Sequence, residues 1–152
     1  MVTTVGTEDT HEDLVLALLE LEHDALAAYG AAIGRLEDPT LVAQMRDFRA
    51  DHERHVASLS EVTASLGLKM PDGSMKSVLT SGKVVLAELA GDRAILHAMR
   101  TNEEDTVTAY QRASESTCAS EATLATSREA HADELRHRAW MERTADALGK
   151  AN

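Results

Sequence analysis

The sequence predicts an all-α protein, a four-helix bundle built from two repeated helical hairpins with a long central connection. Aromatic residues make up only 3% of the 152 residues, and Ala and Leu supply most of the apolar side chains, which favours helices over sheets. Apolar residues alternate at spacings of three and four along four long segments, as in amphipathic helices. The chain also repeats part of itself, which predicts two copies of one helical unit.

The repeat is clearest where polar residues occupy the same places in both copies. The matched pairs, eighty-one or eighty-two residues apart, are Glu22 and Glu103, Tyr29 and Tyr110, Asp51 and Asp133, Arg54 and Arg136, and His55 and His137. Two similar hairpins would place such pairs at equivalent positions. For Arg54 and Arg136, we expect a solvated face or a salt bridge between helices.

The first hairpin is predicted at residues 11–67. Residues 1–10 are polar and expected to be loose, and Thr10 resembles the start of a capping box that opens the first helix. Asp38-Pro39 marks the start of the second helix, with Asp as the N-cap and Pro at the first helical position. Gly67 fits the position just past the end of that helix.

A long connection at residues 68–91 is predicted to follow, with a short helical stretch at residues 84–89. The second hairpin is predicted at residues 92–149, and its first helix at residues 92–114. Short turns within the hairpins and a long connection between them are typical of a four-helix bundle with a crossover. A chain of this length supports one core, so we expect a single domain over residues 1–152.

Composition excludes several classes of function. The chain has 15 Lys and Arg against 26 Asp and Glu, a formal charge of −11, which is unfavourable for binding nucleic-acid phosphates. Cys118 is the only cysteine, so there is no disulfide framework and no Cys-rich metal site. No apolar run has the length of a membrane span, and no signal peptide is recognisable. We therefore expect a cytoplasmic protein with neither nucleic acid nor membrane as a partner.

Polar residues that can bind a metal interrupt the apolar inner stripes of all four helices. The first and third helices each carry one Glu, whereas the second and fourth each carry two polar groups three residues apart, on one helical face. Oxygen and nitrogen donors suit iron, manganese or zinc better than a softer metal. The six candidate ligands, which we expect to converge, are Glu22, His52, His55, Glu103, Glu134 and His137.

Each candidate ligand, taken alone, has an ordinary explanation. A single Glu on an inner stripe is usually a tolerated position, and an inner His is usually a hydrogen-bonded core residue. Together, however, three buried carboxylates and three buried imidazoles without compensation would cost roughly several kcal/mol per charge. Cations or a closed hydrogen-bond network must therefore neutralise them.

This arrangement resembles the ferritin-like superfamily of di-iron carboxylate proteins, in particular bacterioferritins, rubrerythrins and small uncharacterised relatives. The family pattern is one Glu followed by Glu-x-x-His, repeated on successive helices, and the resemblance spans residues 11–149. It implies a ferritin-like bundle with these ligands: Glu22 and Glu103 as terminal carboxylates, Glu134 as a bridging carboxylate, and His55 and His137.

The resemblance also implies outer partners for these ligands. In the family, a carboxylate just before each motif holds a ligand His of the opposite helix, and a metal-bound imidazole needs such support. A Tyr two turns after each terminal Glu binds a ligand carboxylate across the bundle, although core packing would also explain it. The residues at these places are Asp51, Asp133, Tyr29 and Tyr110.

His52 departs from the family pattern, because a bridging Glu is expected there. Its loss removes one negative charge and one link between metals, so the sequence leaves open whether one or two ions bind and whether His52 is a ligand. We therefore expect His52→Glu to raise iron occupancy toward two per chain. Glu53 stands where bacterioferritins carry their haem-ligating Met, so no haem is expected.

The sharper functional hypothesis is a non-haem iron oxidoreductase of the ferroxidase or peroxide-scavenging type. Its partners would be metal ions and dioxygen or peroxide, with iron as the metal and zinc or manganese as the other choices. No catalytic residues are expected beyond the metal ligands. The alternative is a non-catalytic, stress-related or structural bundle that binds a single metal or none. We expect a homo-oligomer, either a dimer or a cage.

Overall fold

The computed structural model describes residues 3–70 and 89–151, which form four α-helices and no strand. The short helical stretch expected at residues 84–89 lies outside the described residues except for Leu89, which is not helical. The helices are α1 (His11–Ile33), α2 (Pro39–Ser65), α4 (Asp92–Ser114) and α5 (Glu121–Lys150).

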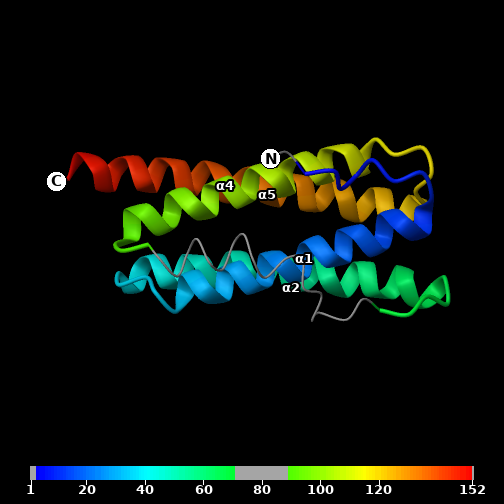
Figure 1. Cartoon of the computed structure of the whole chain (residues 1–152), viewed down its shortest axis with the longest axis horizontal. Coiled ribbons are helices and arrows are strands. Elements are labelled where there is room, and N and C mark those ends of the chain that lie inside the picture. The colour runs from blue at the N-terminus through cyan, green and yellow to red at the C-terminus, as the bar shows by residue number, and fades with distance from the viewer. Residues whose placement is uncertain (1–2, 71–88, 152) are drawn as a thin grey trace.

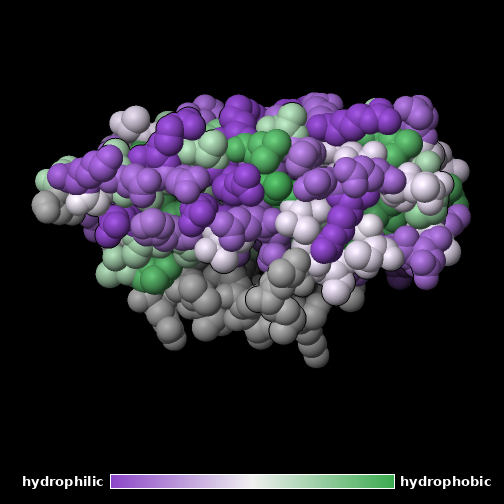
Figure 2. Space-filling model, turned by 90° about the horizontal axis from the view of Figure 1, so that it is seen from above, coloured by the Kyte–Doolittle hydropathy of each residue, from purple (hydrophilic) through white to green (hydrophobic). Residues whose placement is uncertain are grey.

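The helices pair into two hairpins, which Figure 1 shows as two layers. One layer is α1 packed on α2 and the other is α4 packed on α5, while contacts of α1 with α4 and of α2 with α5 join the layers. This arrangement confirms the predicted all-α four-helix bundle. The face of the bundle that Figure 2 shows is mainly hydrophilic, and none of the described helices is long and apolar enough to cross a membrane.

The helix ends follow the capping residues in the sequence. The Thr10 hydroxyl accepts a hydrogen bond from the backbone N–H of Asp13 at 3.2 Å, and the Asp38 carboxylate accepts one from Thr40 at 2.8 Å. Such caps satisfy backbone donors that the first turn of a helix leaves free. Gly67 follows α2 with φ +67°, a conformation that glycine adopts without steric cost.

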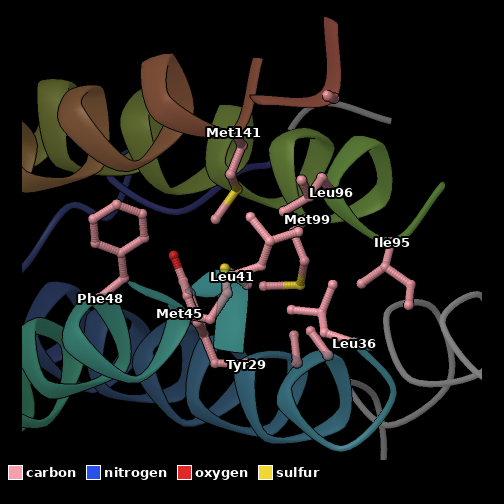
Figure 3. Packing of buried hydrophobic residues seen from close by; sticks show 12 residues of the cluster. Tyr29, Leu36, Leu41, Met45, Phe48, Ile95, Leu96, Met99 and Met141 are labelled. Atoms are coloured by element: carbon pink, nitrogen blue, oxygen red, sulfur yellow. The ribbon is translucent and has the colours of Figure 1, made fainter. Parts of the chain in front are cut away.

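Two apolar clusters fill the bundle, one on each side of its middle. In the first, Met45, Met99 and Met141 enter the same space from α2, α4 and α5 (Figure 3). The second cluster is built on α1 residues such as Leu14 and Leu18 and on the end of α2. The residues between the clusters, at the centres of α1, α2 and α4, are Glu22, His52 and Glu103. The polar residues therefore lie far from the helix ends.

The N-terminal segment, expected to be loose, contacts α4. Arg112 donates a hydrogen bond to the backbone oxygen of Thr3 at 2.7 Å, and the carboxylate of Asp105 accepts one from the backbone N–H of Thr3 at 3.3 Å. Gly6 has φ +96°, and a Cβ there would lie 2.6 Å from the Cβ of Arg112. Glycine therefore permits the close approach of this segment to α4.

Candidate metal centre

The six candidate ligands converge at the middle of the bundle, where each is at most 2% exposed. They form two overlapping groups of four, and within each group one donor atom from every residue lies within 4.8 Å of the others. We call Glu22, His52, His55 and Glu134 the first donor group, and His52, Glu103, Glu134 and His137 the second donor group.

Direct hydrogen bonds between imidazoles and a carboxylate hold the first donor group together. The Nδ1–H of His52 donates to Oε2 of Glu22 at 2.7 Å, and the Nδ1–H of His55 donates to Oε1 of Glu22 at 3.0 Å. The hydroxyl of Tyr110 also donates to Oε1 of Glu22. Oε1 of Glu134 lies 3.6 Å from both Nδ1 atoms. Glu22 is therefore the centre of this group.

The second donor group is more open. Nδ1 of His137 lies 3.7 Å from Oε2 of Glu103 and 3.5 Å from Oε2 of Glu134, and Nε2 of His52 lies 3.9 Å from Oε1 of Glu103. Hydroxyl groups bind the carboxylates instead: Tyr29 donates to Glu103 at 2.5 Å, and the Thr106 hydroxyl lies 3.1 Å from Oε2 of Glu134.

Each outer histidine is held from behind by an aspartate of the opposite hairpin. Nε2–H of His55 donates to Oδ2 of Asp133 at 2.9 Å, and Nε2–H of His137 donates to Oδ2 of Asp51 at 2.9 Å. These contacts are those that the resemblance to ferritin-like proteins implies. Because a carboxylate only accepts hydrogen bonds, each of these Nε2 atoms carries a proton, and Nδ1 of each ring is turned toward the donor groups.

Two arginines fix these aspartates on the surface between α2 and α5. Arg54 donates to Asp51 at 2.8 Å and to Asp133 at 2.7 Å, and Arg136 donates to the same two residues at 2.7 and 3.1 Å. Partial burial would raise the pKa of Asp51, but the hydrogen bonds from His137, Arg54 and Arg136 outweigh it and hold that pKa below its usual range. Both arginines therefore form salt bridges between helices.

The buried charges shift one another's pKa values. Burial alone would raise the pKa of Glu22, but the charge and hydrogen bond of His52 and the bond from His55 lower it to about 2. Burial and the nearby Glu103 raise the pKa of Glu134 well above its usual value. Burial opposes the charge on His137, but Glu103 and Glu134 raise its pKa to about 9. Protons therefore balance part of the buried negative charge.

Two buried donor atoms of the cluster lack a hydrogen-bond partner within the described part of the chain: Nε2 of His52 and Oε1 of Glu134. An unsatisfied buried polar atom costs about 1–3 kcal/mol, and both atoms lie in the donor groups. Three imidazoles and three carboxylates also match the preferences of divalent iron, manganese or zinc. The cluster can therefore hold a metal ion, and its donor set fits one.

The sequence interpretation missed two residues that shape the site. The ring of Phe48 lies 4.2 Å from that of His137, centroid to centroid. Thr106 contacts two of the carboxylates. The sequence could have indicated this role of Thr106, because Thr106 lies three residues after Glu103, on the same helical face.

Comparison with protein families gives one match. A family model described as "Domain of unknown function (DUF2383)" matches residues 13–116, more than half of the chain. The matched region includes the central residues of α1, α2 and α4 but not α5, which carries Glu134 and His137. Comparisons with curated proteins and with solved structures found no match.

Proposed function

The chain belongs to the DUF2383 family, and we propose that it is a ferritin-like, metal-binding oxidoreductase that uses non-haem iron and reacts with dioxygen or peroxide. The observation that carries this proposal is the pair of overlapping, fully buried donor groups at the centre of the bundle. The resemblance of the ligand pattern to di-iron carboxylate proteins supports the choice of iron.

In this proposal each terminal carboxylate serves one donor group. Glu22 would bind in the first group and Glu103 in the second, while Tyr110 and Tyr29 orient them through hydrogen bonds from the opposite hairpin. Glu134 would serve both groups, because Oε1 faces the first group and Oε2 the second.

The histidines would bind through Nδ1. Asp133 and Asp51 hold the opposite ring nitrogens of His55 and His137, so rotation of either ring would break a hydrogen bond. Bound iron would supply the electrons that reduce dioxygen or peroxide. The apolar clusters on both sides keep bulk water away, which strengthens the interaction of the carboxylates with a cation.

Anaerobic titration with Fe(II) followed by exposure to air tests the proposal. We expect iron to bind in stoichiometric amount, and oxygen consumption to be faster than with the same Fe(II) in buffer. As a control, Glu53→Gln should bind iron and consume oxygen as the unchanged chain does, because Glu53 is exposed on α2 and pairs with Arg49. Iron bound without oxidant consumption would support the non-catalytic bundle instead. No binding would refute the proposed oxidoreductase and leave only a bundle that binds no metal.

Thermal unfolding gives a second readout that does not depend on turnover. A cation that binds only the native state adds about 2.7 kcal/mol when its free concentration is a hundredfold above Kd. We therefore expect the melting temperature of the metal-loaded protein to fall on chelation. An unchanged melting temperature, in protein shown beforehand to contain metal, would contradict the proposal that a bound cation offsets the buried negative charges.

A further inference from the structure

We infer that His52 joins the two donor groups by binding one cation through each ring nitrogen, Nδ1 in the first group and Nε2 in the second. This inference rests on the proposed function, because it concerns the ligands of the same site. It assigns the chain two divalent cations and gives the departure from the family pattern a chemical role.

The orientation of the His52 ring carries the inference. Nδ1 lies 2.7 Å from Oε2 of Glu22 and 3.6 Å from Oε1 of Glu134, both in the first group. Nε2, on the other side of the ring, lies 3.9 Å from Oε1 of Glu103 in the second group. That distance is too long for a hydrogen bond, and Nε2 has no other partner among the described residues. One ring nitrogen therefore faces each group.

The two shared residues have the same property. His52 and Glu134 are the only members common to both donor groups, and each presents two donor atoms on opposite sides. Oε1 of Glu134 faces His55, and Oε2 faces His137. The members that belong to a single group are the terminal ligands. The geometry is that of two sites linked by one carboxylate and one imidazole.

Charge balance agrees with this assignment. The sequence interpretation counted His52 as neutral, and for that reason left open whether one or two ions bind. An imidazole that binds cations through both nitrogens has released its ring proton to solvent and carries one negative charge, since ligands bind metals in their deprotonated form. The carboxylates of Glu22, Glu103 and Glu134 together with this imidazolate then match the four positive charges of two divalent cations.

Zinc titration of the full chain tests the inference, because Zn(II) is redox-inert and keeps the protein diamagnetic. We expect native mass spectrometry to show two zinc ions per chain. In protein labelled with ¹⁵N-histidine, we expect one of the seven histidines to lose both ring protons at saturation. His55 and His137 should retain the Nε2 proton that each donates to an aspartate.

Two variants assign the signal. His52→Gln should remove the doubly deprotonated ring, whereas His97→Gln, at an exposed position of α4, should leave it in place. The count of such rings in the wild-type spectrum does not depend on either variant, so the test stands even if His52→Gln fails to fold.

The outcomes separate this inference from the proposed function. A ring proton retained on every histidine at saturation would overturn the bridging role while leaving metal binding intact. One zinc ion in the wild type and two in His52→Glu would do the same, and would support the expectation drawn from the sequence. Failure of zinc to bind would overturn both the inference and metal binding at this site.

Discussion

The two donor groups share His52 and Glu134 but differ in how their remaining members are bonded. In the first group, Glu22 accepts hydrogen bonds from two imidazoles, at 2.7 and 3.0 Å. In the second group, His137 lies 3.5 Å or more from the nearest oxygens of Glu103 and Glu134. The ligands of the first group are therefore hydrogen-bonded to one another, whereas His137 of the second group is not hydrogen-bonded to Glu103 or Glu134.

Hydroxyl groups account for part of this difference. The carboxylate of Glu103 is bound by Tyr29 and lies 3.3 Å from the Thr106 hydroxyl, which also contacts Glu134. The residue that matches Thr106 in the first hairpin is Ala25, which has no hydroxyl. Matched ligands on matched helices therefore do not make equal sites, because their neighbours decide which atoms satisfy the carboxylates.

The largest expected effect comes from the shared carboxylate. Glu134→Gln should weaken metal binding in both groups, by more than roughly the hundredfold that loss of an outer partner can cause, because one substitution removes a charged donor from each. Isothermal titration with Zn(II) measures this, with Glu53→Gln as the control for an exposed carboxylate of α2. One site that retained its affinity would show that Glu134 serves a single group.

The outer aspartates allow each group to be weakened separately. Asp133→Asn should act on the first group through His55, and Asp51→Asn on the second through His137, with losses of roughly 10–100-fold in metal affinity. The same titration separates the two sites, and Asp47→Asn, exposed on α2, is the control. If both variants weakened the same site, the assignment of one aspartate to each group would be wrong.

Metal-free stability should reveal the unequal bonding. Glu22→Gln should lower the free energy of unfolding by about 1–3 kcal/mol, since two buried imidazole donors lose their ionised acceptor. Glu103→Gln should cost less, because the hydroxyl of Tyr29 can also donate to the amide oxygen. Urea unfolding in the presence of a chelator measures both variants. The reverse ranking would contradict the comparison of the two groups.

The smallest expected effect concerns the residue that distinguishes the hairpins. Thr106→Val keeps the side-chain shape and removes the hydroxyl, so it should cost about 0.5–1.5 kcal/mol of unfolding free energy. Thr108→Val, at a half-buried position of the same helix, is the matched control, because the Thr108 hydroxyl bonds to the backbone of Glu104 and to no carboxylate. Equal effects in the two variants would mean that the Thr106 hydroxyl is not important for the second group.

Helical periodicity and the repeat were enough to predict the fold and the inner faces of the helices. The spacing of His52 and His55 put both on the inner face of α2 whatever the packing. The contacts of Asp51 with His137 and of Tyr29 with Glu103 were implied by the resemblance to ferritin-like proteins, which have partners of this kind across the bundle. The repeat and the helical period place such residues at equivalent positions but do not by themselves identify their partners.

The missed features depend on distances between helices. The contact of Phe48 with His137 and the different hydrogen bonding of the two groups depend on how the helices pack against one another, which periodicity does not specify. The contact of Thr3 with α4 depends on the side chain of Arg112, far away in the chain. The direction in which each ring nitrogen of His52 points likewise depends on the packing of the helices and cannot be predicted from periodicity.

Both donor groups draw ligands from three helices and from both hairpins. The first uses α1, α2 and α5, and the second uses α2, α4 and α5. Neither hairpin contains a complete group, so a cation gains its full set of ligands only after the hairpins have docked. Interactions formed after the folding transition state slow unfolding and leave the folding rate unchanged. The metal should therefore prolong the lifetime of the folded chain without helping it to form.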